Sequence, residues 1–225
     1  LVVVPYYHEG VSDGPRPIGP SGREYVAVLT GEENVQWEAG NTSRGIGERL
    51  PAGARVNLHA GLLEITYRNG AKVLLQGPGE YVIDGNNSGE LVSGRLVANV
   101  PQRATGFTAT TPSAQIVDLG TEFGLAVEDE QATQVLVFDG TVSARLRMPD
   151  GQWGSSRFVS AGEGVRIDGA EQSMVAHAVP ASSFRRQTAP QPTLLGSPVI
   201  ARQGVDTASG VTLIFGGVAA KSGVA

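Results

Sequence analysis

Apolar and polar residues alternate in short runs along the middle of the chain. In Leu63–Tyr67 every second residue is apolar, as in a strand that buries one face. Asn69-Gly70 follows, and this pair favours a type I′ hairpin because both turn residues need positive φ. Similar runs recur at spacings of roughly 6 to 12 residues: Tyr25–Leu29, Lys72–Gln76, Tyr81–Ile83, Leu91-Val92, Arg95–Val100, Phe107–Thr110, Gln115–Leu119, Glu122–Val127, Gln134–Phe138, Thr141–Leu146, Arg157–Ser160 and Gly164–Ile167.

The pattern predicts an all-β fold of many short antiparallel strands in two packed sheets. No segment in this region keeps a helical period. A strand-glycine-strand unit in 91–98 is echoed in 137–144 and, more weakly, in 161–167. Repeated units of this kind indicate stacked or coiled sheets, so we also expect β-solenoid or roll character.

Composition divides the chain into four parts. Residues 1–23 are rich in proline and glycine and predict an extended lead-in, whose apolar start 1–4 reads either as the end of a membrane helix or as a short strand. Residues 24–175 form the expected β domain. Residues 176–210 carry Pro, Ala and Ser and predict a linker, with Arg185-Arg186 as solvated charges. Residues 211–225 hold one apolar run, either a strand or the start of a further domain.

Charge and cysteine content exclude several classes of function. The formal net charge is −5, whereas a nucleic-acid binder needs a concentrated basic patch, so we expect no nucleic-acid partner. The chain has no cysteine, which excludes disulfides and thiolate metal sites. No run approaches the ~20 apolar residues that span a bilayer, so no membrane span is expected within the chain.

Catalytic constellations are missing from the sequence. The only histidines are His8, His59 and His177, and two of them fall in the expected tails. A G-x-S-x-G match at 10–14 lies in the lead-in, without the strand and helix that a nucleophile elbow needs. The acidic run 128–130 reads as a solvated turn, with a weak calcium contact as the alternative. We therefore expect no catalytic residues, no metal site and no cofactor.

Two tryptophans are the remaining candidates for ligand contact. Trp37 sits in an apolar strand-like run, where core packing is the simpler interpretation. Trp153 follows Pro149-Asp150-Gly151 in an expected loop, and it is the aromatic residue that we retain as a possible contact.

Several motifs, in order, resemble the FecR family. Val117–Gly124, with the sequence VDLGTEFG, looks like the signature in which an apolar strand leads into Leu-Gly-Thr-x-Phe. Val135–Val142 is similar to the family's V-x-V-x-x-G-x-V strand pair, and Ala161-Gly162-Glu163 resembles its closing block. The resemblance extends over about Val26 to Ile167, in the variant found in planctomycete-type bacteria. It marks six signature residues: Asp118, Leu119, Gly120, Thr121, Phe123 and Gly140.

The signature residues read as folding elements. Gly120 permits a tight strand junction, Thr121 can satisfy nearby backbone groups through its hydroxyl, and Phe123 supplies core area. None of these roles requires a substrate.

The resemblance implies a signal relay without catalysis. FecR proteins pass an outer signal to a sigma factor, and in related proteins the domain follows a cytoplasmic sigma-interacting region and one membrane helix. The implied location is the periplasm or cell envelope, tethered to the inner membrane. The implied partner is another envelope protein or a polysaccharide. A sigma factor would be reached only through a cytoplasmic region absent from this chain.

Two points keep an alternative open. The chain departs from the best-known members because a Pro/Ala-rich stretch stands where they carry a receptor-binding extension, which puts a TonB-dependent receptor partner in doubt. Related proteins often continue into a lectin-like or glucanase domain. A carbohydrate-binding or accessory module of an envelope enzyme is therefore the second hypothesis.

Overall fold

The protein is described here by a computed structural model that covers residues 24–40, 43–129 and 131–188. These residues form strands and two short 3-10 turns, without an α-helix. The strands are β1 (Tyr25–Trp37), β2 (Arg49–Pro51), β3 (Ala54–Tyr67), β4 (Lys72–Gly85), β5 (Ser88–Asn99), β6 (Thr108–Thr110), β7 (Ala114–Asp118), β8 (Glu122–Asp129), β9 (Ala132–Asp139), β10 (Thr141–Leu146), β11 (Arg157–Ser160), β12 (Gly164–Asp168) and β13 (Ser173–Ala176); the turns are η1 (Gln102–Ala104) and η2 (Ala181–Ser183). The predicted all-β class is confirmed.

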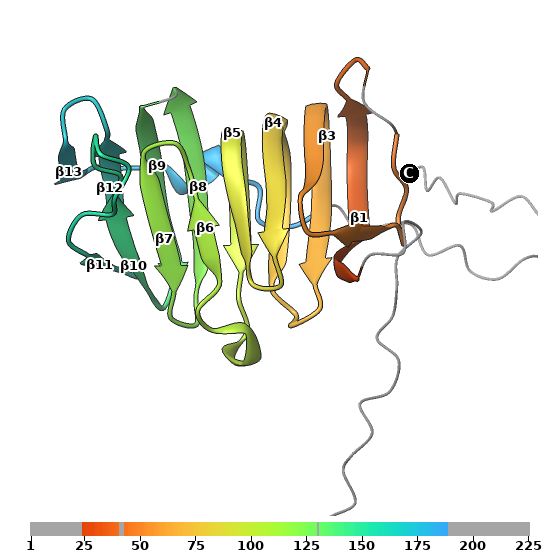
Figure 1. Cartoon of the computed structure of the whole chain (residues 1–225), viewed down its shortest axis with the longest axis horizontal. Helices are drawn as coiled ribbons and strands as arrows, with labels where there is room; N and C mark the ends of the chain where they lie inside the picture. Colours follow the sequence, from red (N-terminus) through yellow and green to blue (C-terminus); the bar gives the residue numbers. More distant parts are fainter. Residues whose placement is uncertain (1–23, 41–42, 130, 189–225) are drawn as a thin grey trace, which may run out of the picture. The chain divides into compact units, whose positions relative to one another are not determined.

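All thirteen strands belong to one hydrogen-bonded sheet that forks at β5 (Figure 1). The start of β5 pairs in parallel with β6, and its end pairs antiparallel with β8. One branch continues as β6-β7-β10-β11 and the other as β8-β9-β12-β13. The remaining pairs are antiparallel, as predicted, and the two expected sheets are the two branches of one sheet. The sheet does not close into a barrel.

The long strands β3, β4 and β5 bend in the middle. Their pairing shifts register between Leu58 and Leu62 and between Gln76 and Glu80. Gly94 has a φ of +88°, and a Cβ there would lie 2.4 Å from the carbonyl oxygen of Pro78. Glycine therefore allows neighbouring strands to approach at the bend, where the sheet turns to cover both sides of the core.

The main core contains residues of the strands before the fork and of both branches. Four aromatic residues are fully buried in it: Tyr67, Tyr81, Phe107 and Phe123. The hydroxyls of Tyr67 and Tyr81 are 2.7 Å apart, and burial raises the pKa of both phenols. The aromatic ring of Tyr67 meets that of Phe107 edge-on, with centroids 5.1 Å apart. Apolar burial on this scale is the main term that stabilises the fold.

A cluster of buried hydroxyls ties the two branches together. The Thr133 hydroxyl on β9 lies 2.7 Å from that of Thr111 and 2.8 Å from that of Ser113, next to β7. All three side chains are buried, so each hydrogen bond satisfies a group that water cannot reach. No helix in the described part of the chain is long and apolar enough to cross a membrane.

Candidate binding surfaces

The FecR-like signature forms the turn between β7 and β8. Asp118 is buried at the end of β7, and its carboxylate accepts the backbone N–H of Gly120 at 2.8 Å and the hydroxyl of Thr121. Burial raises the pKa of Asp118, and the hydrogen bonds from Thr121 and Gly120 oppose that rise. The carboxylate is therefore engaged by its own turn, in an arrangement that shapes the backbone.

The other signature residues surround that turn. Phe123 is fully buried in the main core. Gly140, with a φ of +78°, lies so close that a Cβ would stand 2.6 Å from the carbonyl oxygen of Gly120 and 2.7 Å from Cγ2 of Thr121. Leu119 is the exception, because its side chain is 47% exposed. The structure thus brings Asp118, Gly120, Thr121 and Gly140 into one place.

Trp153 lies away from the signature, in the connection between β10 and β11. Its ring is half-buried and carries the Arg147 guanidinium on one face, with Cζ 4.5 Å from the ring centroid. Its backbone bridges to Arg147. One face of the ring is thus already occupied by protein, and a contact role for Trp153 stays a prediction.

Residues 177–188, called the strap below, lie on the outer face of the branch that contains β8 and β9 (blue in Figure 1). Val179 and Phe184 of the strap are buried in a small apolar cluster of their own, separate from the main core. Its other members come from the sheet: Val97, Ala126, Leu136 and, partly buried, Phe138. The stretch predicted as a linker from residue 176 therefore begins with a segment packed on the sheet, and residues 189–225 lie outside the described part of the chain.

Two residues that flank Phe123 in the signature segment 117–124, together with Glu33 of β1, hold the strap. The Phe184 ring lies directly over Gly124, where an added Cβ would stand 2.9 Å from the ring. Arg186 donates to both carboxylate oxygens of Glu122, with Nε 2.7 Å from Oε1. Arg185 lies 3.1 Å from Glu33. Both arginines thus pair with carboxylates of the sheet, while about half of each side chain stays exposed to solvent.

Sequence reasoning missed the strap because its composition is that of a linker. A signal was nevertheless present. Val179 and Phe184 are large apolar residues in a stretch otherwise rich in Ala, Pro and Ser. Isolated apolar residues in such a stretch favour docking onto a nearby surface.

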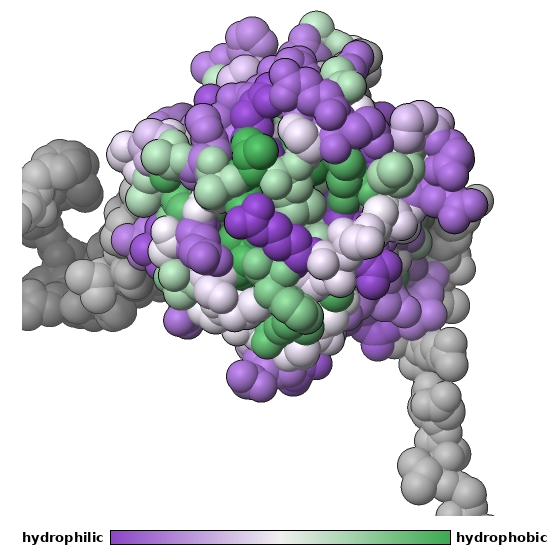
Figure 2. All heavy atoms as spheres, turned by 90° about the vertical axis from the view of Figure 1, so that its left-hand side faces the viewer, coloured by the Kyte–Doolittle hydropathy of each residue, from purple (hydrophilic) through white to green (hydrophobic). Residues whose placement is uncertain are grey.

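The two branches end at neighbouring strand edges, β11 and β13, called the open end below. Each of these strands pairs on one side only. Arg157 of β11 donates through Nη1 to the carbonyl oxygen of Met174 in β13 at 3.3 Å, which links the two edges. Phe158 and Val175 are 64% and 51% exposed. Figure 2 shows this end, with apolar groups gathered in the middle of a hydrophilic surround.

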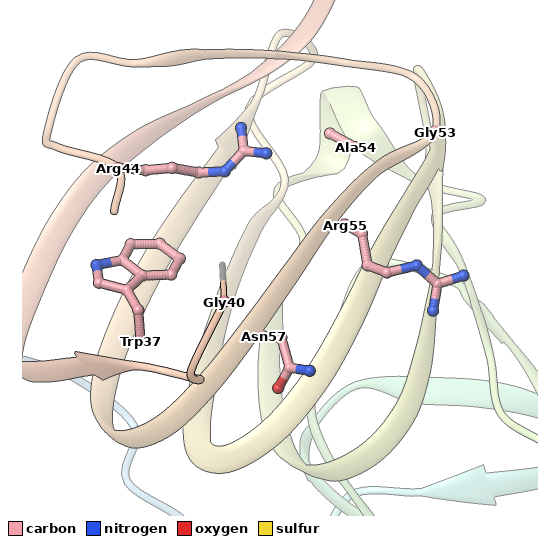
Figure 3. A pocket seen from close by; sticks show the side chains of 7 residues that line it. All are labelled: Trp37, Gly40, Arg44, Gly53, Ala54, Arg55 and Asn57. Carbon is pink, nitrogen blue, oxygen red and sulfur yellow. The ribbon is translucent and has the colours of Figure 1, made fainter. Parts of the chain in front are cut away.

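A polar pocket lies at the other end of the sheet, beside β1 and β3 (Figure 3). Its volume is about 330 Å³. The residues that line it are Trp37, Gly40, Arg44, Gly53, Ala54, Arg55 and Asn57. Trp37 is partly buried and packs against the main core, as expected, and it also forms one wall of this pocket.

Hydrolytic or metal chemistry finds little support among the described residues. They contain no group of three or more His, Asp or Glu side chains placed to hold a metal ion. His59 is exposed, with Nδ1 3.6 Å from Glu38, and Glu122 is engaged by Arg186. The acidic residues Glu128 and Asp129 are exposed at the end of β8. His8 and the G-x-S-x-G match lie outside the described residues.

Comparison with known proteins matches part of the chain to a family model and to solved structures. Residues 54–143 match the family model described as FecR protein. Two crystal structures of "a putative anti-sigma factor" from Parabacteroides distasonis ATCC 8503 align with TM-scores of 0.45 at 17% and 18% identity. Each alignment covers 55% of this chain and 59% of the other, so this chain spans less than two thirds of that protein. No curated protein matches.

The family match runs from the start of β3 into β10. It includes the bent strands, the Asp118 turn and Gly140, which are the parts that carry the motif resemblance. The resemblance to the FecR family that the sequence motifs indicate is therefore confirmed over residues 54–143.

Proposed function

We propose that this β domain is the outer, signal-receiving module of a membrane-anchored regulator of an alternative sigma factor. The FecR match supports the regulatory role, because FecR proteins relay outer signals to sigma factors. On this proposal the domain acts by binding an envelope protein, without catalysis. The sigma factor is reached through a cytoplasmic region outside this chain.

The open end is the observation that carries the binding proposal. Natural proteins protect exposed strand edges with charged residues, proline or short strands, because a bare edge pairs with other chains. At the far end of the sheet β2 follows this rule, with three residues that include Arg49 and Pro51. Strands β11 and β13 are also short, with four residues each, but their sequences RFVS and SMVA contain no proline and one charged residue, Arg157, which is tied to Met174.

An extended segment of a partner protein fits such an edge. It would gain backbone hydrogen bonds along β11 or β13, and its side chains could pack on Phe158 or Val175. Exposed apolar residues at the centre of a polar surround are typical of protein interfaces. We therefore assign the open end to a protein partner.

The test uses aspartate substitutions at the two exposed apolar residues. Phe158→Asp and Val175→Asp each place a charge in the proposed interface, and hot-spot residues, which cluster near the centre of an interface, contribute about 2 kcal/mol or more to binding. Both side chains are exposed, so the melting temperature should stay within about 2 °C of wild type. In the full-length regulator, sigma-dependent transcription should stop responding to its signal.

Ile46→Asp is the matched control. Ile46 is also exposed, at 54%, but it lies in the connection between β1 and β2, outside the open end. The control should respond like wild type. A normal response in the Phe158→Asp/Val175→Asp double variant would contradict the assignment of the open end.

The proposed location has its own test. The chain has no cysteine, so Ser155→Cys adds a single exposed thiol between β10 and β11. A membrane-impermeant maleimide should label it in intact cells whose outer membrane has been permeabilised. Labelling that requires lysis of the inner membrane would place the domain in the cytoplasm and contradict the proposal.

A further inference from the structure

The strap begins directly where the edge strand β13 ends. The last residue of β13 is Ala176, and the backbone N–H of His177 donates to the carbonyl oxygen of Gly164 at 2.9 Å, which continues the pairing of β13 with β12. Val179 then packs over Gly164, where an added Cβ would stand 3.1 Å from Cγ2 of Val179. The strap is thus anchored to the sheet from its first residues onward.

From β12 the strap crosses the outer face of the sheet as far as β1 (Figure 1). Phe184 lies over Gly124 of β8, and Thr188 lies beside Gly31 of β1, where an added Cβ would stand 3.8 Å from Oγ1 of Thr188. Glycine at these positions, as at the anchor on β12, lets the backbone of the strap approach the sheet closely. The strap therefore contacts the sheet along its whole length.

Strand β13 has few attachments of its own. It has four residues, and within the described part of the chain it pairs only with β12. Val175 and Ala176 are exposed, and Met174 is the residue of β13 that packs against the main core. Arg157 of β11 adds one hydrogen bond, to the carbonyl oxygen of Met174 at 3.3 Å. A strand with so few buried contacts opens at a low free energy unless a neighbouring element holds it.

The strap supplies the attachment that β13 lacks. Val179 and Phe184 are 8% and 5% exposed, in an apolar cluster that contains no residue of β13. Arg186 adds its hydrogen bonds to both carboxylate oxygens of Glu122. Because the strap follows β13 in the chain without a gap, docking of the strap restricts the end of β13. The two elements are therefore expected to open together.

The strap is also the covalent connection between β13 and residues 189–225. An event that acts on that part of the chain reaches β13 through the strap. We propose that β13 and the strap form one latch, residues 173–188, and that release of the latch removes the β13 edge from the open end. A partner that pairs with the docked edge strengthens docking of the strap in return, because such coupling is reciprocal. This regulation rests on the proposed function, in which the open end is the binding site.

A removable covalent bond tests the latch. A Cβ on Gly124 would stand 3.0 Å from Cγ of Phe184, which is bonded to the Cβ of that residue. The two Cβ atoms therefore lie at most about 4.5 Å apart, within the span of a disulfide. The chain has no cysteine, so Gly124→Cys/Phe184→Cys forms one defined disulfide in place of the ring. When reduced, the variant lacks the phenylalanine ring, and when oxidised, it holds the strap covalently.

Hydrogen–deuterium exchange of the full chain is measured in both states. In the reduced variant, exchange should rise roughly 30-fold in β13 and in the strap together, the effect expected for loss of a buried ring on an outer face. In the oxidised variant, exchange of both elements should stay within about threefold of wild type. Strand β11, the other edge of the open end, should change less than about twofold in either state. Wild type, which has no cysteine, is the control for the reductant.

Two exchange results would overturn the latch. The first is faster exchange in the strap of the reduced variant with unchanged exchange in β13, because β13 would then hold without the strap. The second is unchanged exchange in both elements of the reduced variant.

Transcription in cells separates the latch from the proposed function. In the full-length regulator, Phe184→Ala should abolish the response to the signal, as Phe158→Asp/Val175→Asp does. A normal response in Phe184→Ala alone would show that the strap does not control the open end, and the proposed function would stand. A normal response in Phe158→Asp/Val175→Asp would instead contradict the assignment of the open end, and the exchange data would still decide whether β13 and the strap open together.

Discussion

Phe184 is expected to hold the strap on the sheet. Its ring is 5% exposed and meets the Phe138 ring edge-on, with centroids 5.9 Å apart. Phe184→Ala removes this ring while the ion pairs of Arg185 and Arg186 remain. Because the apolar cluster of the strap is separate from the main core, we expect residues 177–188 to detach locally while the rest of the sheet stays folded.

The magnitude follows from the burial of the ring. Phenylalanine-to-alanine changes in closed cores cost roughly 3–5 kcal/mol. The strap lies on the outer face and can settle partly into the space, so we expect about 2 kcal/mol. At about 1.4 kcal/mol per factor of ten, this raises the population of the detached strap roughly 30-fold.

Trypsin measures this population directly. Arg185 and Arg186 are tryptic sites with exposed side chains, but cleavage needs an extended backbone that the docked strap does not offer. Under conditions where reclosing outpaces cleavage, the rate of appearance of the product ending at these arginines should rise roughly 30-fold in Phe184→Ala. Mass spectrometry identifies the product.

The control is a second phenylalanine of opposite burial. Phe158 is 64% exposed on β11, so Phe158→Ala should change the cleavage rate less than about twofold. Equal cleavage rates in Phe184→Ala and wild type would refute the claim that the ring holds the strap.

Three further predictions concern the signature and the core. Gly140→Ala should lower the free energy of unfolding by about 3 kcal/mol, and the control Gly162→Ala by about 1 kcal/mol. Both positions need positive φ, but only at Gly140 would a Cβ meet Gly120 and Thr121. Equal losses of stability in urea titrations would contradict the importance of this contact. Thr133→Val should cost about 1–2 kcal/mol because it removes the buried hydroxyl that bonds to both Thr111 and Ser113, whereas exposed Thr30→Val should stay within ~0.5 kcal/mol. The raised pKa of Asp118 means that the folded state favours the protonated carboxyl. The stability gained from this protonation is complete below the unfolded-state pKa of about 3.9, and it is lost as pH rises through the folded-state pKa. Wild type should therefore lose stability relative to Asp118→Asn over that interval, and parallel thermal stability profiles of the two proteins would contradict the assignment.

Alternation and turn chemistry predicted most of the strands. The hairpin at Asn69-Gly70 joins β3 to β4, where the pattern places it. The sequence pattern gives Lys72–Gln76 and Tyr81–Ile83 as separate runs, yet both belong to β4, which continues through Gly77-Pro78-Gly79 to Gly85. Glycine permits a shift of register within a strand as readily as the end of a strand, and the pairing with neighbouring strands decides which of the two occurs.

The fork at β5 could not be read from the sequence. It depends on the first part of β5 pairing with β6 and the last part with β8, and periodicity within one strand does not identify its neighbours. For the same reason, the exposed apolar residue Phe158 looked like any other strand residue. Its exposure follows from the position of β11 at the end of a branch.

The contacts of the signature are partly local and partly distant in sequence. Gly120 and Thr121 donate to Asp118, two and three positions earlier, and Phe123 is buried in the core. Glu122 and Gly124 have a role that depends on residues about 60 positions later in the chain, since they meet Arg186 and Phe184. Contacts between such distant positions leave no local pattern.

The proposed function makes this domain the signal-receiving part of a sigma-factor regulator. To test this role, residues 24–188 are deleted from the native gene, with the reading frame and the remaining regions kept, and the transcripts are compared with those of wild-type cells. We expect a coordinated change, independent of any added signal, in genes whose promoters share one recognition element. An unchanged transcript profile, both with and without envelope stimuli, would contradict it.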